Sequence, residues 1–382
     1  MDLGSSRRYE IELWSSSGLR IADISAFCFN RRYTMQRNEA ETLTFDVNLY
    51  AFEKYCLNNL GGIDPKTLIA PYVTDVKVKR NGLYLFGTQV VDVNFDLAQD
   101  MSRAGESGGG AAATTQDQKV SITATGYLNL LKDRYVTKTY AATERTAIAT
   151  DLITTTQAQT NGSVGITISG SQYLTTQLSD RTYQLDEVKN KIQEMAALSD
   201  SPFDFDFSPL KAFRTYAKIG ARRQDINLIY GGALGNVAGF ALDRSAINLF
   251  NKIYGIGSGF GTSQLTSTAG DNASQLNYYL REQIQQFNSV LLQPTLDQNT
   301  STALSLEKDI LELPVVTITG KEIPATFLSV GDRIPLKVMT HKWLDNINGL
   351  YRIEQIDVTI DENDFESAIK LTFDSYGVNQ SE

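Results

Sequence analysis

Cysteine and long apolar runs are scarce in this chain, and each shortage excludes a kind of protein. The two cysteines among 382 residues, Cys28 and Cys56, cannot form a disulfide framework or a zinc quartet. No stretch approaches the roughly 18 apolar residues of a membrane helix, and the first residues lack the apolar core of a signal peptide. We therefore predict no membrane segment and a chain folded in a cytoplasm, from which it can leave as part of a larger particle.

Clustered positive charge is also missing. The formal net charge is −9 and the pI is about 4.9, so the basic footprint of a nucleic-acid-binding protein is not expected. The arginine pairs at 7–8, 31–32 and 222–223 are interpreted as solvated or salt-bridged surface rather than as phosphate clamps. What the chain does have is an ordinary globular composition, with 42% hydrophobic residues, over a length that predicts two or three domains.

Strand patterns dominate both ends of the sequence. Residues 42–49, TLTFDVNL, alternate apolar and polar side chains, which is typical of a strand with one buried face. A short helix is predicted to follow, because Phe52, Cys56 and Leu60 recur every four residues before two glycines. On this helix Cys56 is interpreted as a buried thiol.

A hairpin signal occurs near the start of the chain and again near its end. Asn81-Gly82 separates two strand-like segments, and Asn-Gly is the strongest two-residue hairpin signal because both positions of a type I′ turn need positive φ. Residues 81–84, Asn-Gly-Leu-Tyr, recur at 348–351, and Asp-Val-x-[Phe/Ile]-Asp follows both copies. Agreement over consecutive strands favours internal duplication, so we predict two related β units on one chain.

Between the two β units the pattern changes. Residues 143–153 and 186–198 have helical spacing and flank short strands, which indicates an α+β segment. We therefore predict an α+β, mainly β chain with two related antiparallel β-barrel domains and an inserted α+β domain. The expected parts are a first β-barrel domain at 1–137 with a mobile loop at 104–118, an α+β middle domain at 138–228, and a second β-barrel domain at 229–382 with helices at 274–292 and 300–312.

The helix expected at 274–292 depends on an apolar stripe with Ser274 as its N-cap. The stripe consists of Leu276, Tyr279, Leu280, Ile284, Phe287 and Leu291.

Several longer segments resemble those of a known family. They are RRYTMQRNEAETLTFDVNL (31–49), GYLNLLKDRYV (126–136), IQEMAALSDSPFDFDF (192–207), FALDRSAINLFNKIYGIGSG (240–259), LSVGDRIPLKV (328–338) and the closing GLYRIEQIDVTI. In order and spacing they resemble the tail hub, or baseplate hub, proteins of tailed bacteriophages, including minor tail proteins of long-tailed phages. No single motif is sharp, so the resemblance depends on order over most of the chain.

The resemblance implies a structural virion protein at the tail tip, assembled in the host cytoplasm. It implies a homotrimer whose two barrels per chain form a pseudo-sixfold ring around a channel, adapting the symmetry of the tail tube. The implied partners are a distal tail protein or tube ring, the tape-measure protein and a central fibre or spike, with phage DNA passing without specific binding. No hydrolase is expected after the last strand of this chain.

Possible catalytic or ligand sites are weak by comparison, and we expect no catalytic residue, cofactor or metal. Gly105-x-Ser107-x-Gly109 matches a nucleophile-elbow pattern, but a flexible loop explains it better, because the chain has one histidine, His341. That histidine is interpreted as exposed, with pH tuning of a contact as the alternative. GIGSGFG (255–261) is interpreted as a turn or bulge rather than a dinucleotide fingerprint. The acidic run at 361–366 (Asp361, Glu362, Asp364, Glu366) is interpreted as a solvated hairpin tip, with weak cation binding as the alternative.

The alternative function is that of a cell-surface protein that binds or degrades carbohydrate. Its signature would be exposed aromatic platforms and a carboxylate pair about 5–10 Å apart. Asp204 and Asp206 are the candidates for that pair, because strand alternation places them on one face.

Overall fold

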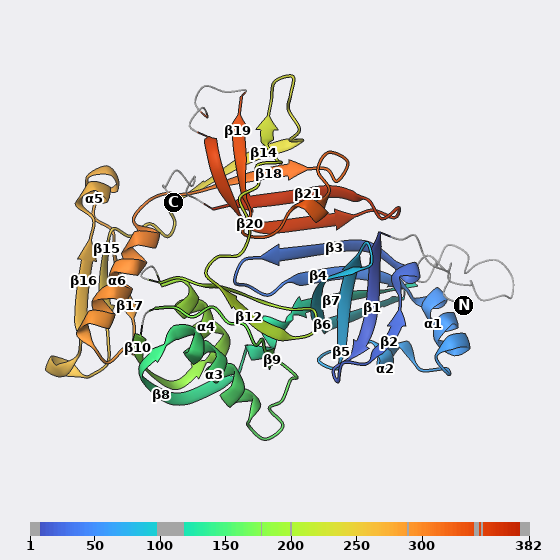
Figure 1. The fold of residues 1–382 in the computed structure, drawn as a ribbon, viewed down its shortest axis with the longest axis horizontal. Helices are drawn as coiled ribbons and strands as arrows, with labels where there is room; N and C mark the ends of the chain where they lie inside the picture. The colour runs from blue at the N-terminus through green and yellow to red at the C-terminus, as the bar shows by residue number, and fades with distance from the viewer. Residues whose placement is uncertain are drawn as a thin grey trace, which may run out of the picture.

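A single large sheet dominates the computed structural model, which describes residues 8–97, 118–176, 178–198, 201–288, 290–339, 344 and 347–374 (Figure 1). The sheet has 13 strands, and both ends of the chain contribute to it. Its main path follows the order β14 (Gly239–Ser245), β18 (Leu311–Ile318), β21 (Glu366–Phe373), β20 (Asn348–Ile360), β3 (Cys28–Gln36), β4 (Thr42–Asn48), β7 (Gln118–Gly126), β6 (Leu83–Leu97), β5 (Thr74–Arg80), β1 (Tyr9–Ser15) and β2 (Arg20–Asp23). Off this path, β19 (Arg333–Val338) pairs with β20, and β13 (Leu228–Tyr230) lies parallel to β19.

Strands β3 and β20 join the two β units into this one sheet. They pair antiparallel from Gln36 opposite Gln355 to Arg31 opposite Ile360. The buried side chains of both units also belong to one hydrophobic core. The two units therefore share both one sheet and one core. The predicted mainly β, α+β class is confirmed, while the pairing of the described strands shows no closed barrel.

The repeated sequence occupies the same place in the pairing order of both units. Strand β6 pairs first with β5 and then with β7, and β20 pairs first with β19 and then with β21. The order continues through β4 and β3 in one unit and through β18 and β14 in the other. Other pairings differ between the units. Strand β1 is antiparallel to β5 whereas β13 is parallel to β19, and β20 also pairs with β3, whereas no described strand pairs with β6 in that way. The pairing order agrees with internal duplication, and Asn81-Gly82 has the predicted positive φ values of 50° and 77°.

Two short helices, α1 (Leu49–Asn59) and α2 (Pro65–Leu68), lie near the β2 end of the sheet (Figure 1). Helix α1 confirms the predicted spacing, because Phe52 and Cys56 are buried, and Leu60 follows it as the C-cap. Of the helices in the described part of the chain, none combines the length and apolar character needed to cross a membrane.

The middle of the chain builds a second hydrophobic core. In the view of Figure 1 this part of the chain lies below the second β unit and to the left of the first. Apolar residues of the helices, such as Ile148, Leu152 and Ile192, pack there with Phe203 and Phe205. The elements are the 3-10 helix η3 (Tyr127–Leu131), β8 (Tyr135–Glu144), α3 (Arg145–Gln157), β9 (Thr167–Ile168), β10 (Leu178–Glu187), α4 (Val188–Ala196), β11 (Asp204–Phe207) and β12 (Ala212–Tyr216). Strands β8 and β10 pair with each other, and β12 pairs with both β11 and β9.

Residues 246–310 form a small unit between β14 and β18, here named the satellite unit. It consists of β15 (Lys252–Ile256), the 3-10 helix η4 (Gly261–Ser263), β16 (Thr266–Gly270), α5 (Asn272–Tyr278), β17 (Glu282–Gln286) and α6 (Gln293–Glu307). Strand β15 lies between β16 and β17, and α6 packs on one face of this sheet. The approach is close, because a Cβ at Gly255 would overlap Thr300 of α6.

The helix predicted at 274–292 is wrong beyond Tyr278. The buried Asn251 side chain donates to the Tyr279 carbonyl (2.7 Å) and accepts from the Arg281 N–H (2.9 Å). These bonds use backbone groups that a continuing helix would need, so the helix ends before them. Tyr279 has a φ of 62°, and the following residues pair with β15 as β17. The predicted cap is also wrong, because Asp271 accepts from the Ser274 N–H. The second predicted helix, 300–312, begins earlier and ends earlier, as α6.

Tyr279→Gly is expected to stabilise the chain relative to Tyr279→Ala by about 1 kcal/mol. Tyr279 has φ 62° and ψ 173°, a region that costs a residue with a Cβ about 1–3 kcal/mol and costs glycine little. Its side chain is 85% exposed, so both substitutions remove little packing. Urea unfolding of the two variants measures the difference, and equal stabilities would show that this backbone stores no strain.

Candidate functional site

The exposed face of the joined sheet is polar over its central strands. In β4, Leu43, Phe45 and Val47 are buried in the core, so Thr42 and Thr44 lie on the opposite face. The neighbouring strands follow the same alternation. We name this surface the polar sheet face, and its members are Thr317, Lys370, Thr372, Gln355, Asp357, Thr359, Arg32, Thr34, Thr42, Thr44, Asp46, Lys119, Ser121 and Thr123.

The strand register aligns these side chains in rows that cross from one β unit to the other. One row consists of Thr317, Lys370, Asp357, Thr34 and Thr42, and the next consists of Thr359, Arg32, Thr44 and Thr123. In β21, β20, β3, β4 and β7, as far as the structure describes them, no large hydrophobic side chain is exposed. The result is a hydroxyl-rich surface that water can hydrate and that has no apolar patch to attract another molecule.

The carboxylates of the polar sheet face are already hydrogen-bonded. Asp46 accepts from Asn30 (2.9 Å), Ser121 (2.7 Å) and Lys119 (3.1 Å). Burial alone would raise the pKa of Asp46, but these hydrogen bonds outweigh it and keep the pKa below its ordinary value. Asp357 accepts from Thr34 (2.5 Å), a neighbour across the β3–β20 pairing that joins the units.

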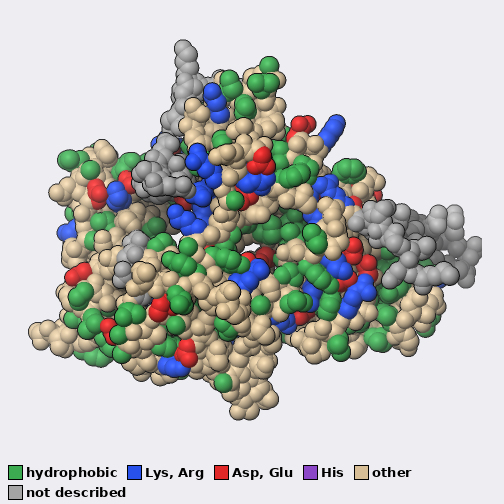
Figure 2. Space-filling model, in the orientation of Figure 1, with side chains coloured by type: hydrophobic (Ala, Val, Ile, Leu, Met, Phe, Trp, Pro, Cys, Tyr) green, Lys and Arg blue, Asp and Glu red, His purple; other side chains and the backbone are tan. Residues whose placement is uncertain are grey.

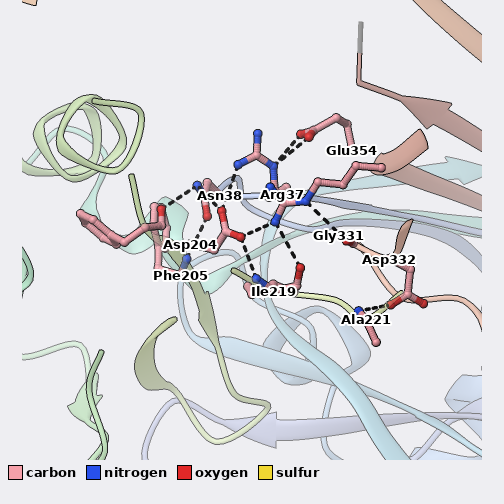
Figure 3. Close-up of polar contacts among 11 residues, drawn as sticks. Arg37, Asn38, Asp204, Phe205, Ile219, Ala221, Gly331, Asp332 and Glu354 are labelled. Atoms are coloured by element: carbon pink, nitrogen blue, oxygen red, sulfur yellow. Dashed lines mark hydrogen bonds and ion pairs between the residues drawn. The ribbon is translucent and has the colours of Figure 1, made fainter. Parts of the chain in front are cut away.

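A network centred on Asp204 connects the middle of the chain to both β units (Figure 3). Asp204 of β11 binds Arg37, which follows β3, at 3.0 Å, and it also binds Arg352 of β20. Its Oδ2 accepts from the Ile219 N–H at 2.7 Å, and Arg37 in turn binds Glu354 of β20 at 2.8 Å. One carboxylate therefore holds three parts of the chain at one point.

Asp204 is only 3% exposed, so its charge depends on these partners. Burial would raise its pKa, but Arg352, the Ile219 N–H and Arg37 outweigh that effect and lower the pKa. The adjoining Asn38 reinforces the contact, because its Oδ1 accepts from the Phe205 N–H at 2.9 Å. Sequence reasoning missed this network, since nothing in the local pattern pairs residue 37 with residues 204 and 352.

The two carboxylates that were candidates for glycan chemistry have other partners in the structure. Asp204 is occupied as described, and Asp206 makes a two-point ion pair with Arg214, with both N···O distances at 2.7 Å. Tyr216 also donates to Asp206, at 3.3 Å. A general acid or nucleophile needs a carboxyl group that can reach its substrate, and both of these groups face arginines instead.

Glu366 corrects the interpretation of the acidic run as a solvated tip. It is 2% exposed, binds Arg80 and Arg8 of the first β unit, and accepts from the Tyr9 hydroxyl at 2.7 Å. Asp364, nearer the tip, binds Arg31. These contacts tie the β21 end to the first β unit. In the described ranges, no group of three or more His, Cys, Asp and Glu side chains is arranged to hold a metal.

Of the remaining candidates, the turn interpretation of GIGSGFG is confirmed. Gly259 and Gly261 have φ values of 107° and 59°, and the segment ends in the 3-10 helix η4. The Gly105-x-Ser107-x-Gly109 pattern and His341 lie outside the described residues. So does the loop predicted at 104–118, except for Gln118, which begins β7.

Glu41 immediately precedes β4 and lies close to residues of the middle of the chain. Its carboxyl lies so close to Gly126 that a Cβ there would overlap it, and Asp206, Arg214 and Glu39 are its charged neighbours. Burial, with smaller contributions from the two acids, raises the pKa of Glu41 from 4.5 to about 7. Between pH 4.5 and about 7, the Glu41 carboxyl therefore stays protonated in the folded chain, whereas it ionises in the unfolded chain.

Glu41→Gln is expected to stabilise the chain by about 1–3 kcal/mol at pH 8 and to have little effect near pH 4.5. Because the folded-state pKa is raised, the stability of the parent chain falls as pH rises from 4.5 to 7, and glutamine removes that loss. Urea unfolding of both proteins over this pH range measures the difference. A difference that does not change with pH would contradict the prediction.

No family model and no curated protein matches the sequence, whereas several solved structures match the fold. The 43 kDa tail protein of prophage MuSo2 from Shewanella oneidensis is similar, with a TM-score of 0.58, 13% identity and coverage of 95% of this chain and 98% of that chain. The tail protein from Neisseria meningitidis MC58 has a TM-score of 0.59 and 10% identity, with coverage of 97% of this chain and 97% of that chain. Prophage tail protein gp18 from Listeria monocytogenes EGD-e has a TM-score of 0.53 and 13% identity, with coverage of 97% of this chain and 95% of that chain.

These three similarities extend over nearly the whole of each chain, so they include the β units, the middle segment and the satellite unit. All three are named as tail proteins. The resemblance seen in the sequence is confirmed at the level of structure: this chain has the fold of phage and prophage tail proteins.

Proposed function

We propose that this chain is a structural hub of a phage tail. Three copies form a ring at the distal end of the tail tube, in which the two β units of each chain give pseudo-sixfold symmetry. The polar sheet face lines the channel. The observation that carries the proposal is the continuous sheet, whose rows of hydroxyl groups cross from one β unit to the other through β3 and β20.

A channel wall of this kind would let DNA pass without binding it. Duplex DNA binds mainly through phosphate contacts with Lys and Arg, and here threonine hydroxyls alternate with charges of both signs. Asp46 also neutralises its neighbour Lys119. A net charge of −9 adds no general attraction for DNA. The ring would meet a distal tail protein or tube ring on one side and a fibre or spike on the other, with the tape-measure protein inside, in a virion assembled in the host cytoplasm.

The trimer is tested by mass photometry of the purified chain, with negative-stain microscopy of the same sample. The expected result is a species of three times 42.3 kDa with ring-shaped particles of sixfold appearance. A monomer at every accessible concentration, together with binding to a glycan array, would favour the carbohydrate-binding alternative.

The channel wall is tested by the triple variant Thr34→Lys, Thr44→Lys and Thr123→Lys. The parent chain is expected not to bind a 30-base-pair DNA duplex at 0.15 M salt, whereas the variant binds, and the logarithm of its affinity falls with log salt with a slope of about −3. The matched control replaces the same threonines by glutamine, whose side chain is nearly as long as that of lysine but carries no charge. Equal DNA affinity of the glutamine and lysine variants would contradict a neutral wall.

A further inference from the structure

The two halves of strand β20 pair with different strands along the edge that faces away from β21. The first half pairs with β19, and the second half, from Gln355 to Ile360, pairs with β3. Its repeat counterpart β6 begins in the same way, since its first half pairs with β5. Beyond Val90, whose carbonyl accepts from the Tyr72 N–H, no described strand pairs with that edge of β6. The pairing that β20 makes with β3 therefore has no counterpart at β6 within the described chain.

The second half of β6 is also less buried than its counterpart. The repeat aligns Val93 and Phe95 with Val358 and Ile360. Val358 and Ile360 are 0% and 5% exposed, and β3 runs beside them. In contrast, Phe95 is 40% exposed and Val93 is only partly buried. An open strand edge with an uncovered apolar side chain is a template for a further strand.

Strand β14 is the counterpart of β3 in the second unit. The pairing order is β3–β4–β7–β6 in the first unit and β14–β18–β21–β20 in the second. Tyr33 of β3 lies 6.2 Å from Tyr9 of β1 between ring centroids, and Phe240 of β14 lies 5.8 Å from Tyr230 of β13 in the same way. Among the described strands β14 pairs only with β18, so its other edge is open. The open edges of β14 and β6 therefore correspond to the edges that β3 and β20 pair with each other.

We propose that β14 of one copy pairs antiparallel with the second half of β6 of the next copy, as β3 pairs with β20 within each chain. This rests on the proposed trimer and identifies the contact that closes it. The two edges do not meet within one chain, because β18, β21, β20, β3, β4 and β7 lie between them. A contact between two different edges is heterologous and can close into a ring. In that ring the same kind of strand pair joins neighbouring β units within a chain and between chains.

The register of the contact follows from the pairing inside the chain. Since Val93 and Val358 align, their partners on β7 and β21 are equivalent. Counting from these partners across β4 and β18 makes Phe240 of β14 the equivalent of Tyr33 of β3. Tyr33 lies opposite Val358. Phe240 is therefore expected opposite Val93 of the next copy.

The sequence of β14 leaves its edge suited to strand addition. Residues 231–242 contain no charged side chain and no proline, and the charges of β14 begin at Asp243. Figure 2 shows hydrophobic side chains at the top of the view, where Figure 1 places the loop between β13 and β14. Strand edges that avoid association carry charges or proline instead. The second half of β6 carries Asp92 and Asp96, and the uncharged part of β14 sets no like charge opposite them.

One residue further along the strands, the same register sets Ala241 opposite Asp92. Their counterparts within the chain are Thr34 and Asp357, whose side chains are hydrogen-bonded at 2.5 Å. Directly opposite residues of antiparallel strands have Cα atoms about 4.5 or 5.5 Å apart, which is within the range that a disulfide spans. A disulfide between cysteines at positions 92 and 241 therefore reports both the contact and its register.

The experiment uses the double variant Asp92→Cys and Ala241→Cys in a chain that also carries Cys28→Ser and Cys56→Ala. After oxidation, a non-reducing denaturing gel should show loss of most of the monomer to cross-linked dimers and trimers, which a reductant returns to monomer. The chain without the two new cysteines should stay monomeric on the same gel. Far-UV circular dichroism checks the fold of both chains.

The matched control moves one cysteine by a single residue. Asp92→Cys with Leu242→Cys places the second thiol on the opposite face of the sheet, so this pair should not cross-link. Thr34→Cys with Asp357→Cys is the positive control, because these positions are opposite each other within one chain. It should lose both free thiols on oxidation while the chain stays monomeric on the gel.

The outcomes separate this contact from the proposed function. If the parent chain is a trimer by mass photometry and the 92–241 pair does not cross-link, or cross-links no better than the 92–242 pair, the contact is overturned and the proposed hub stands. Cross-linked species that grow beyond three chains support the contact and overturn the threefold ring. A monomeric parent chain together with no cross-link overturns both.

Discussion

Glu366→Ala is expected to destabilise the chain by about 3–5 kcal/mol, a large fraction of the stability of a typical domain. The carboxylate is the shared partner of Arg80 and Arg8 and accepts the Tyr9 hydroxyl. The Arg80 side chain is 3% exposed, so removal of Glu366 leaves a positive charge buried in the core without its partner. Breaking a buried pair in this way is costly because the remaining charge keeps its full desolvation penalty.

Urea unfolding at pH 7 measures this loss, and two variants control it. Glu366→Gln keeps the shape and the hydrogen-bond acceptor but removes the charge, so its stability should fall between those of the parent chain and the alanine variant. Glu362→Ala removes an exposed acid from the same hairpin and should change stability by less than about 0.5 kcal/mol. Equal effects of Glu366→Ala and Glu362→Ala would contradict the assignment of Glu366 to the core.

The regular elements could be predicted from the sequence because their signals are local. Strand β4 has the predicted alternation, and α1 buries Phe52 and Cys56 as the four-residue spacing indicates. The Asn81-Gly82 turn needs only the backbone freedom of its own two residues. The repeat added non-local information, because it placed β6 and β20 in the same position of two pairing orders.

The features that the sequence did not reveal all depend on partners far away in the chain. The helix expected at 274–292 has a correct apolar period, but the side chain of Asn251 interrupts it and β15 pairs with the part that follows. Glu366 has the sequence context of a solvated turn and is buried because Arg80 approaches it from another strand. Likewise, neither β3 nor β20 carries a local sign that the two pair. Tertiary contact overrides local pattern at each of these points.

Asp204→Ala is expected to destabilise the chain by about 2–4 kcal/mol and to loosen the middle segment from the two β units. The substitution leaves Arg37 and Arg352 without the carboxylate they share and removes the acceptor of the Ile219 N–H (Figure 3). The loss should be smaller than for Glu366, because the Arg37 and Arg352 side chains are 27% and 15% exposed and can regain water.

Asp206→Asn provides the matched control two residues away on β11. Asp206 pairs with Arg214 at the surface, with side chains 31% and 38% exposed, so its loss should cost no more than about 1 kcal/mol. Hydrogen exchange then locates the effect: Asp204→Ala should speed exchange of the Phe205 and Ile219 amides, whose acceptors belong to the network, while β4 amides keep their parent rates. Because Asp204 connects three parts of the chain, uniform acceleration over the whole protein would mean that these parts unfold as one cooperative unit rather than separating at this network.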